Sequence, residues 1–401
     1  MTKRDKVVVF TKLFWPEGGG AELATYLIAK NILSNFFDVT IVSGTKQPKA
    51  DILKCCKYIY WSVLKTKYKP AEWLKLLSNT RLIRKLIKYM DVVYIPSHSL
   101  LPLTIIAKTI KPNVKVVTHL HNYQPLTYTS VVLADREPDL ATDIIVERGE
   151  HGSLLRALAS GLGHYMNNVS TLSLYFADKI ICVSRSQYEI LMRYIPAIRS
   201  KAVVIYNPPP PVPDVDKELS NYPTILFSGE GSFIKGSHIA AKVFIRILSQ
   251  HNCRVYFISG YSSSYQHRPL ERHASKFCSK LITLNRLSHE ELMALHRHIW
   301  ATLFPSICEE PLPYFVLESC LLGTVPIASR VGGVPEIVQG TYAEGLMFTP
   351  GDAEEMADRV EEVLSMSKEQ LISIGCELRE TALKRFNSEA TKRQLLKVLG
   401  I

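Results

Sequence analysis

Residues 301–329 read ATLFPSICEEPLPYFVLESCLLGTVPIAS and contain one complete strand–helix–strand unit. The two ends, ATLFPS at 301–306 and VPIAS at 325–329, are short and continuously apolar, which is typical of strands buried on both faces of a parallel sheet. The segment between them, PYFVLESCLLG at 313–323, has the length and apolar character of a buried helix. Parallel strands need such a crossover connection, so this stretch predicts an α/β domain.

The same alternation of strand-like and helical stretches extends over the rest of the chain. Comparable apolar runs form a first series at 6–11, 38–43, 91–96, 115–120, 179–184 and 203–206, and a second series at 224–229, 254–260, 281–285, 301–306, 325–329 and 345–348. Between the two series lies a proline-rich segment, NPPPPVPDVDKELSNYP, which favours an extended linker. We therefore predict two doubly wound, Rossmann-like domains at 1–206 and 224–386, joined by a hinge at 207–223, with a helix at 387–401 packing back on the first domain.

Length and composition exclude several classes of protein. The chain has 401 residues, of which 47% are hydrophobic and 21% charged, so it is globular and large enough for two cores. The longest apolar candidate for a membrane span, 311–328, carries Glu318 in its middle, and the N-terminus lacks the apolar region of a signal peptide. The eight cysteines include no C-x-x-C pair. We expect a cytoplasmic protein without a zinc ribbon.

Positive charge is concentrated in one stretch. The net charge is +11, and twelve basic residues lie between Lys46 and Met90, where Asp51 and Glu72 are the only acids. Tyrosines and tryptophans interleave with the basic residues at Tyr58, Tyr60, Trp61, Tyr68, Trp73 and Tyr89. We expect this stretch to remain exposed and to contact anionic lipid or the acceptor through Lys65, Lys67, Lys69, Arg81, Arg84, Lys85 and Lys88. Nucleic-acid binding is the alternative, but no helix-turn-helix, RNP-like or zinc motif supports it.

Two glycine-containing loops follow predicted strands. Gly18, Gly19 and Gly20 follow the first strand, and residues 228–236 (SGEGSFIKG) follow the first strand of the second domain. Glycines at such a place let backbone amides approach an anion at a helix N-terminus, and Lys235 could reach a phosphate there. Neither loop matches the dinucleotide or Walker A pattern, so a nicotinamide enzyme is not predicted. Residues 122–170 are polar and irregular, and we expect a lid or an acceptor-facing excursion.

A pair of glutamates marks a third loop. Glu310 and Glu318 are eight residues apart, one in the loop and one early in the following helix, so both could face one ligand. The free amides of the helix N-terminus attract a diphosphate, and carboxylates accept hydrogen bonds from sugar hydroxyls. Glu318 lies in an otherwise apolar helix, where an unpaired carboxylate would be costly, so we expect a ligand or a partner for it.

With these motifs in order, nearly the whole chain resembles the GT-B glycosyltransferases, and among them the retaining family 4. The matching segments are GGGAE at 18–22, VVTHLHN at 116–122, KIICVSRSQ at 179–187 with Ser184, VIYNP with Asn207, Lys235–Gly236, the E-x7-E pair, and LLGTVPIASRVGGVPEIV at 321–338. The resemblance implies a donor that is a nucleotide-diphosphate sugar, transferred with retention and with electrostatic rather than metal stabilisation of the leaving group. No cofactor and no metal are expected for donor binding.

The resemblance also implies residue roles. Lys235 would neutralise the diphosphate, Glu310 would hold a donor-sugar hydroxyl and act with His121 and Lys235 in catalysis, and Glu318 would bind the ribose. The donor-binding set comprises Gly19, Gly20, Lys235, Glu310, Leu312, Pro313, Tyr314, Phe315, Glu318 and Arg286. The family's usual arginine after Gly229 is here Glu230, and we expect Arg286 or Arg330 to substitute for it.

Alternatives to this interpretation remain open. A sugar-nucleotide epimerase could use the same fold, and a catalytically inactive nucleotide-sugar-binding protein would explain Glu230. Asp214-Val215-Asp216 has the spacing of a metal motif but lies in the linker, and the pairs His119/His121 and His296/His298 lack a third ligand. We interpret His296 and His298 as helix-surface residues.

The basic stretch between Lys46 and Met90 is the basis for predicting the acceptor and the location of the protein. A lipid-linked saccharide or a polyprenyl-phosphate carrier would explain why a protein without a membrane span has this surface. We therefore expect a peripheral enzyme on the inner face of the cell membrane.

Overall fold

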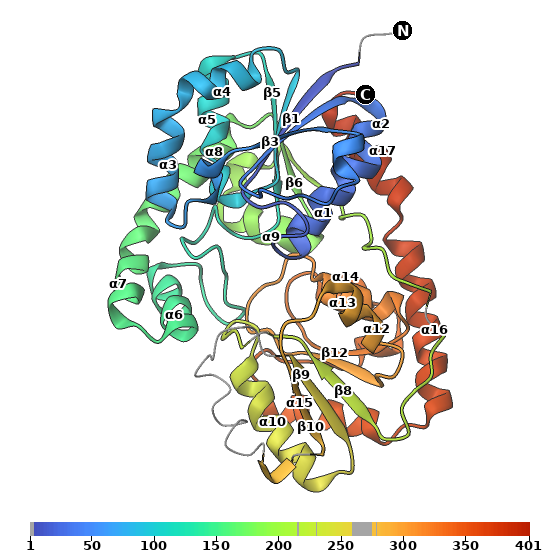
Figure 1. Cartoon of the computed structure of the whole chain (residues 1–401). Coiled ribbons are helices and arrows are strands. Elements are labelled where there is room, and N and C mark those ends of the chain that lie inside the picture. Colours follow the sequence, from blue (N-terminus) through green and yellow to red (C-terminus); the bar gives the residue numbers. More distant parts are fainter. Residues whose placement is uncertain (1–3, 215, 230, 259–274, 278) are drawn as a thin grey trace. The chain divides into compact units, whose positions relative to one another are not determined.

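The computed structural model describes residues 4–214, 216–229, 231–258, 275–277 and 279–401 (Figure 1). The chain divides into two compact units, the first made of residues 1–130, 162–210 and 386–401, and the second of residues 131–161 and 211–385. Both are α/β structures, as the alternating sequence pattern predicts. No helix among the described residues is both long and apolar enough to cross a bilayer.

A seven-stranded parallel sheet forms the centre of the first unit, in the order β3-β2-β1-β4-β5-β6-β7 within the described part of the chain. Its strands are β1 (Lys6–Thr11), β2 (Asp38–Ser43), β3 (Lys57–Tyr60), β4 (Val92–Ile95), β5 (Lys115–Leu120), β6 (Lys179–Cys182) and β7 (Ala202–Val204). Val7 pairs with Val39 on one side and with Val92 on the other, and all three are buried. Sheet pairing therefore buries continuous apolar strands on both faces.

Helices cover both faces of this sheet. They are α1 (Gly20–Ile28), α2 (Ser34–Phe36), α3 (Lys69–Ser78), α4 (Thr80–Ile87), α5 (Leu103–Ile110), α8 (Asn168–Phe176), α9 (Arg185–Tyr194) and α17 (Ser388–Leu399). In Figure 1, α3, α4, α5 and α8 lie on one side of the sheet, and α1, α2 and α17 lie on the other. The core under α3, α4 and α5 includes Phe10, Trp61, Leu76, Ile83 and Ile106.

The second unit is built around a six-stranded parallel sheet in the order β10-β9-β8-β11-β12-β13 among the described residues. Its strands are β8 (Thr224–Phe227), β9 (Arg254–Ile258), β10 (Leu281–Leu284), β11 (Ala301–Phe304), β12 (Val325–Ser329) and β13 (Met347–Phe348). Its helices are α6 (Leu140–His151), α10 (Ser237–Gln250), α12 (His289–Leu295), α13 (Tyr314–Leu321), α14 (Val334–Val338), α15 (Ala353–Leu364) and α16 (Lys368–Arg385), while α7 (Leu154–Gly163) begins here and ends in the first unit. Residues 301–329, which the sequence predicts to be a strand–helix–strand unit, thus form β11, α13 and β12.

Several sequence predictions need correction. The excursion at 122–170 is largely helical, since it contains α6, α7, a 3-10 turn and the start of α8. Residues 131–161 belong to the second unit rather than to the first. Strand β3 was not predicted, because it is a short edge strand whose side chains are mostly exposed. His296 is fully buried and its Nδ1 lies 2.9 Å from Thr324 Oγ1, so its assignment to the helix surface was wrong.

Candidate functional site

The loop between β8 and α10 brings Lys235 next to the loop that follows β11. Gly236 caps α10 with a φ of +71°, and a Cβ at this position would lie 1.9 Å from the carbonyl oxygen of Pro305. Only glycine tolerates both the left-handed conformation and this close approach. Gly236 therefore fixes the position of its neighbour Lys235.

Lys235 and Glu310 form an ion pair in the second unit. The Lys235 ammonium contacts Glu310 Oε1 and lies 5.6 Å from the centre of the Phe304 ring. Burial acts to lower the pKa of Lys235, but the Glu310 carboxylate, aided by Cys308 and Glu150, outweighs it and raises that pKa. Two residues that the sequence assigns to one donor are thus brought together, and a phosphate would compete with Glu310 for the ammonium.

The Glu310 loop is held from behind by a glycine pair that the sequence reasoning did not single out. The Gly333 amide donates to the Glu310 carbonyl over 2.8 Å, and the Gly332 amide donates to the Glu309 carboxylate. Gly332 has a φ of +47°, and a Cβ there would lie 1.9 Å from the Glu310 carbonyl oxygen. A side chain at position 332 would therefore displace Glu310. The V-G-G signal at 331–333 could have indicated this.

Glu318 has a protein partner. Its side chain is 6% exposed, and its Oε1 lies 2.7 Å from His289 Nε2. Burial raises the pKa of Glu318, and the hydrogen bond and charge of His289 oppose that rise. His289 opens α12 behind the capping residue Ser288. The sequence predicted that Glu318 needs a partner but did not identify His289, because nothing in the linear pattern relates α12 to α13.

The remaining predicted donor residues of the second unit lie at the start of α13 or on the surface. Pro313 caps α13, Leu312 and Tyr314 are buried, and Phe315 packs beside Phe304 with ring centres 6.3 Å apart. Burial raises the pKa of the Tyr314 hydroxyl well above its usual range. Arg286 and Arg330 are exposed. Glu230 lies outside the described residues.

The segment 131–161 contacts both loops of this site, which the sequence did not predict. Glu150 Oε1 accepts hydrogen bonds from Ser232 Oγ at 2.6 Å and from the Ile234 amide at 3.0 Å, directly before Lys235. Leu133 pairs with Cys308 in an antiparallel bridge, close before Glu310. The segment 131–161 therefore contacts the backbone next to Lys235 and the backbone next to Glu310.

We expect Glu150→Ala to raise the KM for a nucleotide-sugar donor by about tenfold, because it removes two hydrogen bonds of the loop that carries Lys235. Steady-state kinetics against donor concentration would measure this, with Glu147→Ala on the same helix as the control. Glu147 pairs with Arg156 instead of with the loop. An unchanged donor KM in Glu150→Ala would show that the loop holds its position without this carboxylate.

The predicted residues of the first unit lie near the carboxyl ends of its strands. Gly19 caps α1, its amide donates to Glu22 Oε2 over 2.8 Å, and a Cβ at Gly19 would meet open space. Gly20 is exposed. His121 stacks on His119 with ring centres 4.5 Å apart, and its Nδ1 lies 3.4 Å from Asn207 Nδ2. Among the described residues no group of acidic, histidine or cysteine side chains is arranged to hold a metal ion.

His121 is a neutral imidazole at physiological pH. Burial lowers the pKa of His121 to about 4, and its buried Nε2 has no hydrogen-bond partner among the described residues. A neutral ring with a free nitrogen can donate to or accept from a ligand hydroxyl. His121 can therefore position a hydroxyl but cannot supply positive charge near neutral pH.

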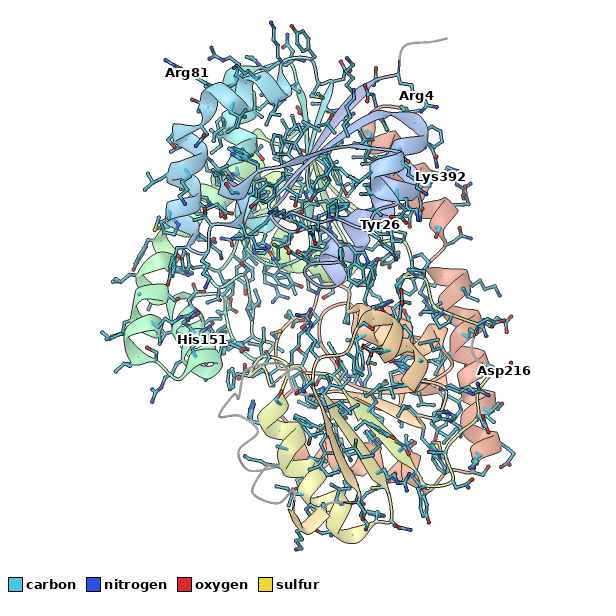
Figure 2. All side chains as sticks on the ribbon, viewed as in Figure 1. Arg4, Tyr26, Arg81, His151, Asp216 and Lys392 are labelled. Atoms are coloured by element: carbon cyan, nitrogen blue, oxygen red, sulfur yellow. The ribbon has the colours of Figure 1, made fainter. Side chains whose placement is uncertain are left out.

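The lowered pKa of His121 makes stability depend on pH. An unfolded histidine titrates near pH 6.5, so between pH 6.5 and 4 the unfolded chain binds more protons than the folded one. Stability is fully present above about pH 6.5 and falls as the pH drops towards 4, by roughly 3 kcal/mol from this group. Thermal unfolding at several pH values should show a shallower acid loss in His121→Gln. The same replacement at the exposed His151 (Figure 2) is the control, and equal slopes in His121→Gln and wild type would contradict the assignment.

The predicted membrane-facing residues divide into two groups. Arg81, Arg84, Lys85 and Lys88 are exposed along α4, and Figure 2 shows Arg81 at the outer edge of the first unit; Lys67 is also exposed. Lys65 pairs with Glu17 at 3.1 Å, and Lys69 points inward to Ser130 Oγ and the Tyr128 carbonyl. The expectation that the whole stretch is exposed was wrong for Trp61 and Trp73, which are buried.

Two family models match consecutive parts of the chain. Residues 18–209 match the model of Glycosyltransferase Family 4, and residues 213–375 match that of Glycosyl transferases group 1. An uncharacterised glycosyltransferase of Methanocaldococcus jannaschii is 26% identical over 209 residues, which are 48% of this chain and 53% of the relative. The chain therefore spans about half the length of that curated relative.

Solved structures share the fold over the whole chain. Sucrose-phosphate synthase from Thermosynechococcus elongatus has a TM-score of 0.75 at 15% identity and covers 98% of both chains. Anabaena HepE in complex with UDP and glucose has a TM-score of 0.71 at 16% identity and covers 99% of both chains. The chain thus has the two-domain GT-B architecture that the sequence resemblance predicts.

Proposed function

Since the chain carries a Glycosyltransferase Family 4 domain followed by a group 1 glycosyltransferase domain on the GT-B fold, we propose that it transfers a sugar from a nucleotide-diphosphate donor. The observation that carries this proposal is the Lys235–Glu310 pair beside the start of α10. A half-buried lysine ammonium directly before the N-terminus of α10 suits a diphosphate. HepE, one of the structural neighbours, binds UDP and glucose, which supports a donor of this class.

The charges of the second unit suggest how the residues divide the work. Lys235 would neutralise the diphosphate as the glycosidic bond breaks, with the amides at the start of α13 nearby. Freed from Lys235, Glu310 would accept a hydrogen bond from a hydroxyl of the donor sugar. Glu318, oriented by His289, would accept one from the ribose. His121, Gly19 and Gly20 would contribute from the first unit, and Arg286 would supply a further positive charge.

The stereochemistry and the metal requirement follow from the same proposal. We expect transfer with retention at the anomeric carbon, as the resemblance implies, and donor binding without a divalent metal. Lys235 and the helix amides supply the positive potential that a metal would otherwise provide. The cluster around Lys235 contains Glu310, Cys308 and Ser306, and we assign it to the donor rather than to a cation.

The surface of the first unit supports a lipid acceptor. Glu72 is fully buried against Lys12, and Asp51 is bonded to Lys30 and Tyr26, so both acids of the basic stretch are engaged within the unit. The exposed basic side chains of α4 are therefore not offset by these acids. A lipid-linked saccharide or polyprenyl phosphate at an anionic membrane surface would meet this charge.

Sugar transfer into lipid tests the proposal. Radiolabelled UDP-, GDP- and ADP-sugars would be incubated with the protein and a bacterial lipid extract, with and without EDTA. We expect label in the organic phase, an anomeric configuration equal to that of the donor, and no loss of product with EDTA. Donor consumption with no labelled acceptor, but with an epimerised sugar, would point to an epimerase. Complete loss with EDTA would contradict the metal-free mechanism.

A further inference from the structure

One helical stretch of the first unit exposes apolar side chains to the solvent. It comprises the end of α7, a 3-10 turn (His164–Asn167) and α8. The exposed large residues are Leu162, Tyr165, Met166, Val169, Leu172, Tyr175 and Phe176, which we call the apolar strip. Leu162 is 71% exposed, Tyr165 68% and Leu172 46%, values far above those of a core residue.

The opposite side of the same stretch is buried and mostly polar, although it also includes the buried Leu174. Asn167, Ser170 and Ser173 are at most 4% exposed. Gln124 Nε2 donates to Asn167 Oδ1 at 3.0 Å and lies 3.3 Å from Ser170 Oγ, and Ser130 Oγ donates to Gln124 Oε1 at 2.7 Å. A helix on the surface of a globular protein normally buries its apolar side and exposes its polar side. Here most of the exposed side chains are apolar and most of the buried ones are polar, which is largely the reverse of that pattern.

The reversal follows the helical period and is not a set of isolated side chains. Most of the strip recurs every three or four residues from 162 to 176, which places it along one side of a helix. Hydrogen bonds from Gln124 fix the polar side inward, so the helix cannot turn the strip into the core without breaking them. A contiguous exposed apolar surface of this kind marks a contact with a partner or a membrane.

The charge on the neighbouring helices favours a membrane over a protein partner for the apolar strip. α8 contacts α5, α5 contacts α4, and all three lie with α3 on one side of the sheet in Figure 1. α3 exposes Leu74 and Leu77, at 67% and 57%, beside Lys75. The exposed charged side chains of α3 and α4 are all basic, and residues 162–176 contain no lysine, arginine or acid. Apolar and basic side chains together complement an anionic bilayer, in which apolar groups enter the interface and cations meet phosphate.

We propose that the apolar strip inserts into the interface of an anionic phospholipid bilayer while the basic side chains of α3 and α4 contact the headgroups. The proposal gives the membrane contact of the proposed function a second, chemically different component. It rests on that membrane contact but not on sugar transfer. Insertion of the strip is insensitive to salt, whereas the headgroup contacts of α3 and α4 weaken as salt screens them.

Vesicle flotation with a double variant tests the insertion. Leu172→Ser/Phe176→Ser removes two apolar side chains of the strip, and Leu383→Ser, at a position 52% exposed on α16, is the matched control. With vesicles of equal parts phosphatidylglycerol and phosphatidylcholine, we expect the double variant to bind at least about tenfold more weakly at both low and high salt. Leu383→Ser should bind like wild type. Stabilisation by a nucleotide-sugar should be unchanged in both variants, which separates this proposal from donor binding.

Two further measurements keep the result decisive. Phe176→Trp should show a blue-shifted emission component that is quenched by brominated lipid, and Leu383→Trp should not. Arg84→Glu/Lys85→Glu should weaken binding mainly at low salt. Wild-type-like vesicle binding by the Leu172→Ser/Phe176→Ser variant would overturn the proposal. So would a wild-type dimer in sedimentation velocity that this variant abolishes, because the strip would then bind a second copy of the chain.

Discussion

Replacing Lys235 with alanine should lower kcat/KM for the nucleotide-sugar donor by about a hundredfold or more. The substitution removes the ammonium that would neutralise the diphosphate in both the bound and the reacting state, and single preorganised donors of this kind contribute about 10²–10³ to the rate. It also leaves Glu310 without its ion-pair partner, so that a carboxylate faces the diphosphate. Repulsion between these negative groups adds to the loss.

The control for this substitution is in α10, the helix that follows the Lys235 loop. Lys242 is an exposed lysine of α10, and Lys242→Ala changes the net charge equally without touching Glu310. Initial-rate kinetics and donor titration of both variants should separate the local effect from a general charge effect. Donor affinity in Lys235→Ala equal to that of wild type would show that Lys235 serves only the ion pair.

Replacing Glu310 with glutamine should lower kcat by about a hundredfold while changing the melting temperature by only a few degrees. The amide is nearly isosteric with the carboxylate, and the loop conformation depends on the main-chain contact between Gly333 and Glu310, which the substitution keeps. What is lost is the negative charge that would accept a sugar hydroxyl and balance Lys235. Glu290→Gln, at an exposed position of α12, is the matched control.

The two substitutions should not be additive, because their side chains contact each other. In a double-mutant cycle, Lys235→Ala/Glu310→Gln should be less impaired than the product of the single effects, since the unpaired carboxylate of the first variant is removed. Strict additivity in kcat/KM would mean that the two residues act independently. Wild-type turnover in Glu310→Gln would remove Glu310 from the reaction.

The sequence predicted those parts of the fold that arise from local pattern. Continuous apolar runs such as 38–43 and 325–329 became buried parallel strands because few other structures can bury such runs. Strand β3 escaped notice because edge strands keep exposed side chains and so lack this signal. The segment 131–161 was assigned to the wrong unit because its destination depends on contacts with Cys308 and Ser232, which lie far away in sequence.

In the candidate site too, the sequence identified residues that belong to motifs but missed residues that act through tertiary contacts. Lys235, Glu310 and Glu318 could be selected from glycine loops and spacing, and the structure brings Lys235 and Glu310 together. His289 and Glu150 could not be selected, because each acts through a hydrogen bond between elements that the sequence does not connect. The aromatic content of the basic stretch misled the surface prediction, since Trp61 and Trp73 complete a core rather than a membrane contact.

Thermal unfolding with nucleotide-sugars tests the central claim most directly, because a ligand that binds only the folded protein raises its stability in proportion to occupancy. Wild type and Lys235→Ala would be heated with UDP-, GDP- and ADP-sugars at concentrations up to a hundred times the expected dissociation constant, where stabilisation reaches about 2.7 kcal/mol. The account predicts that one nucleotide series raises the wild-type melting temperature, in EDTA as well as in buffer, and that Lys235→Ala loses most of that rise. A wild-type protein whose melting temperature no nucleotide-sugar changes would contradict it.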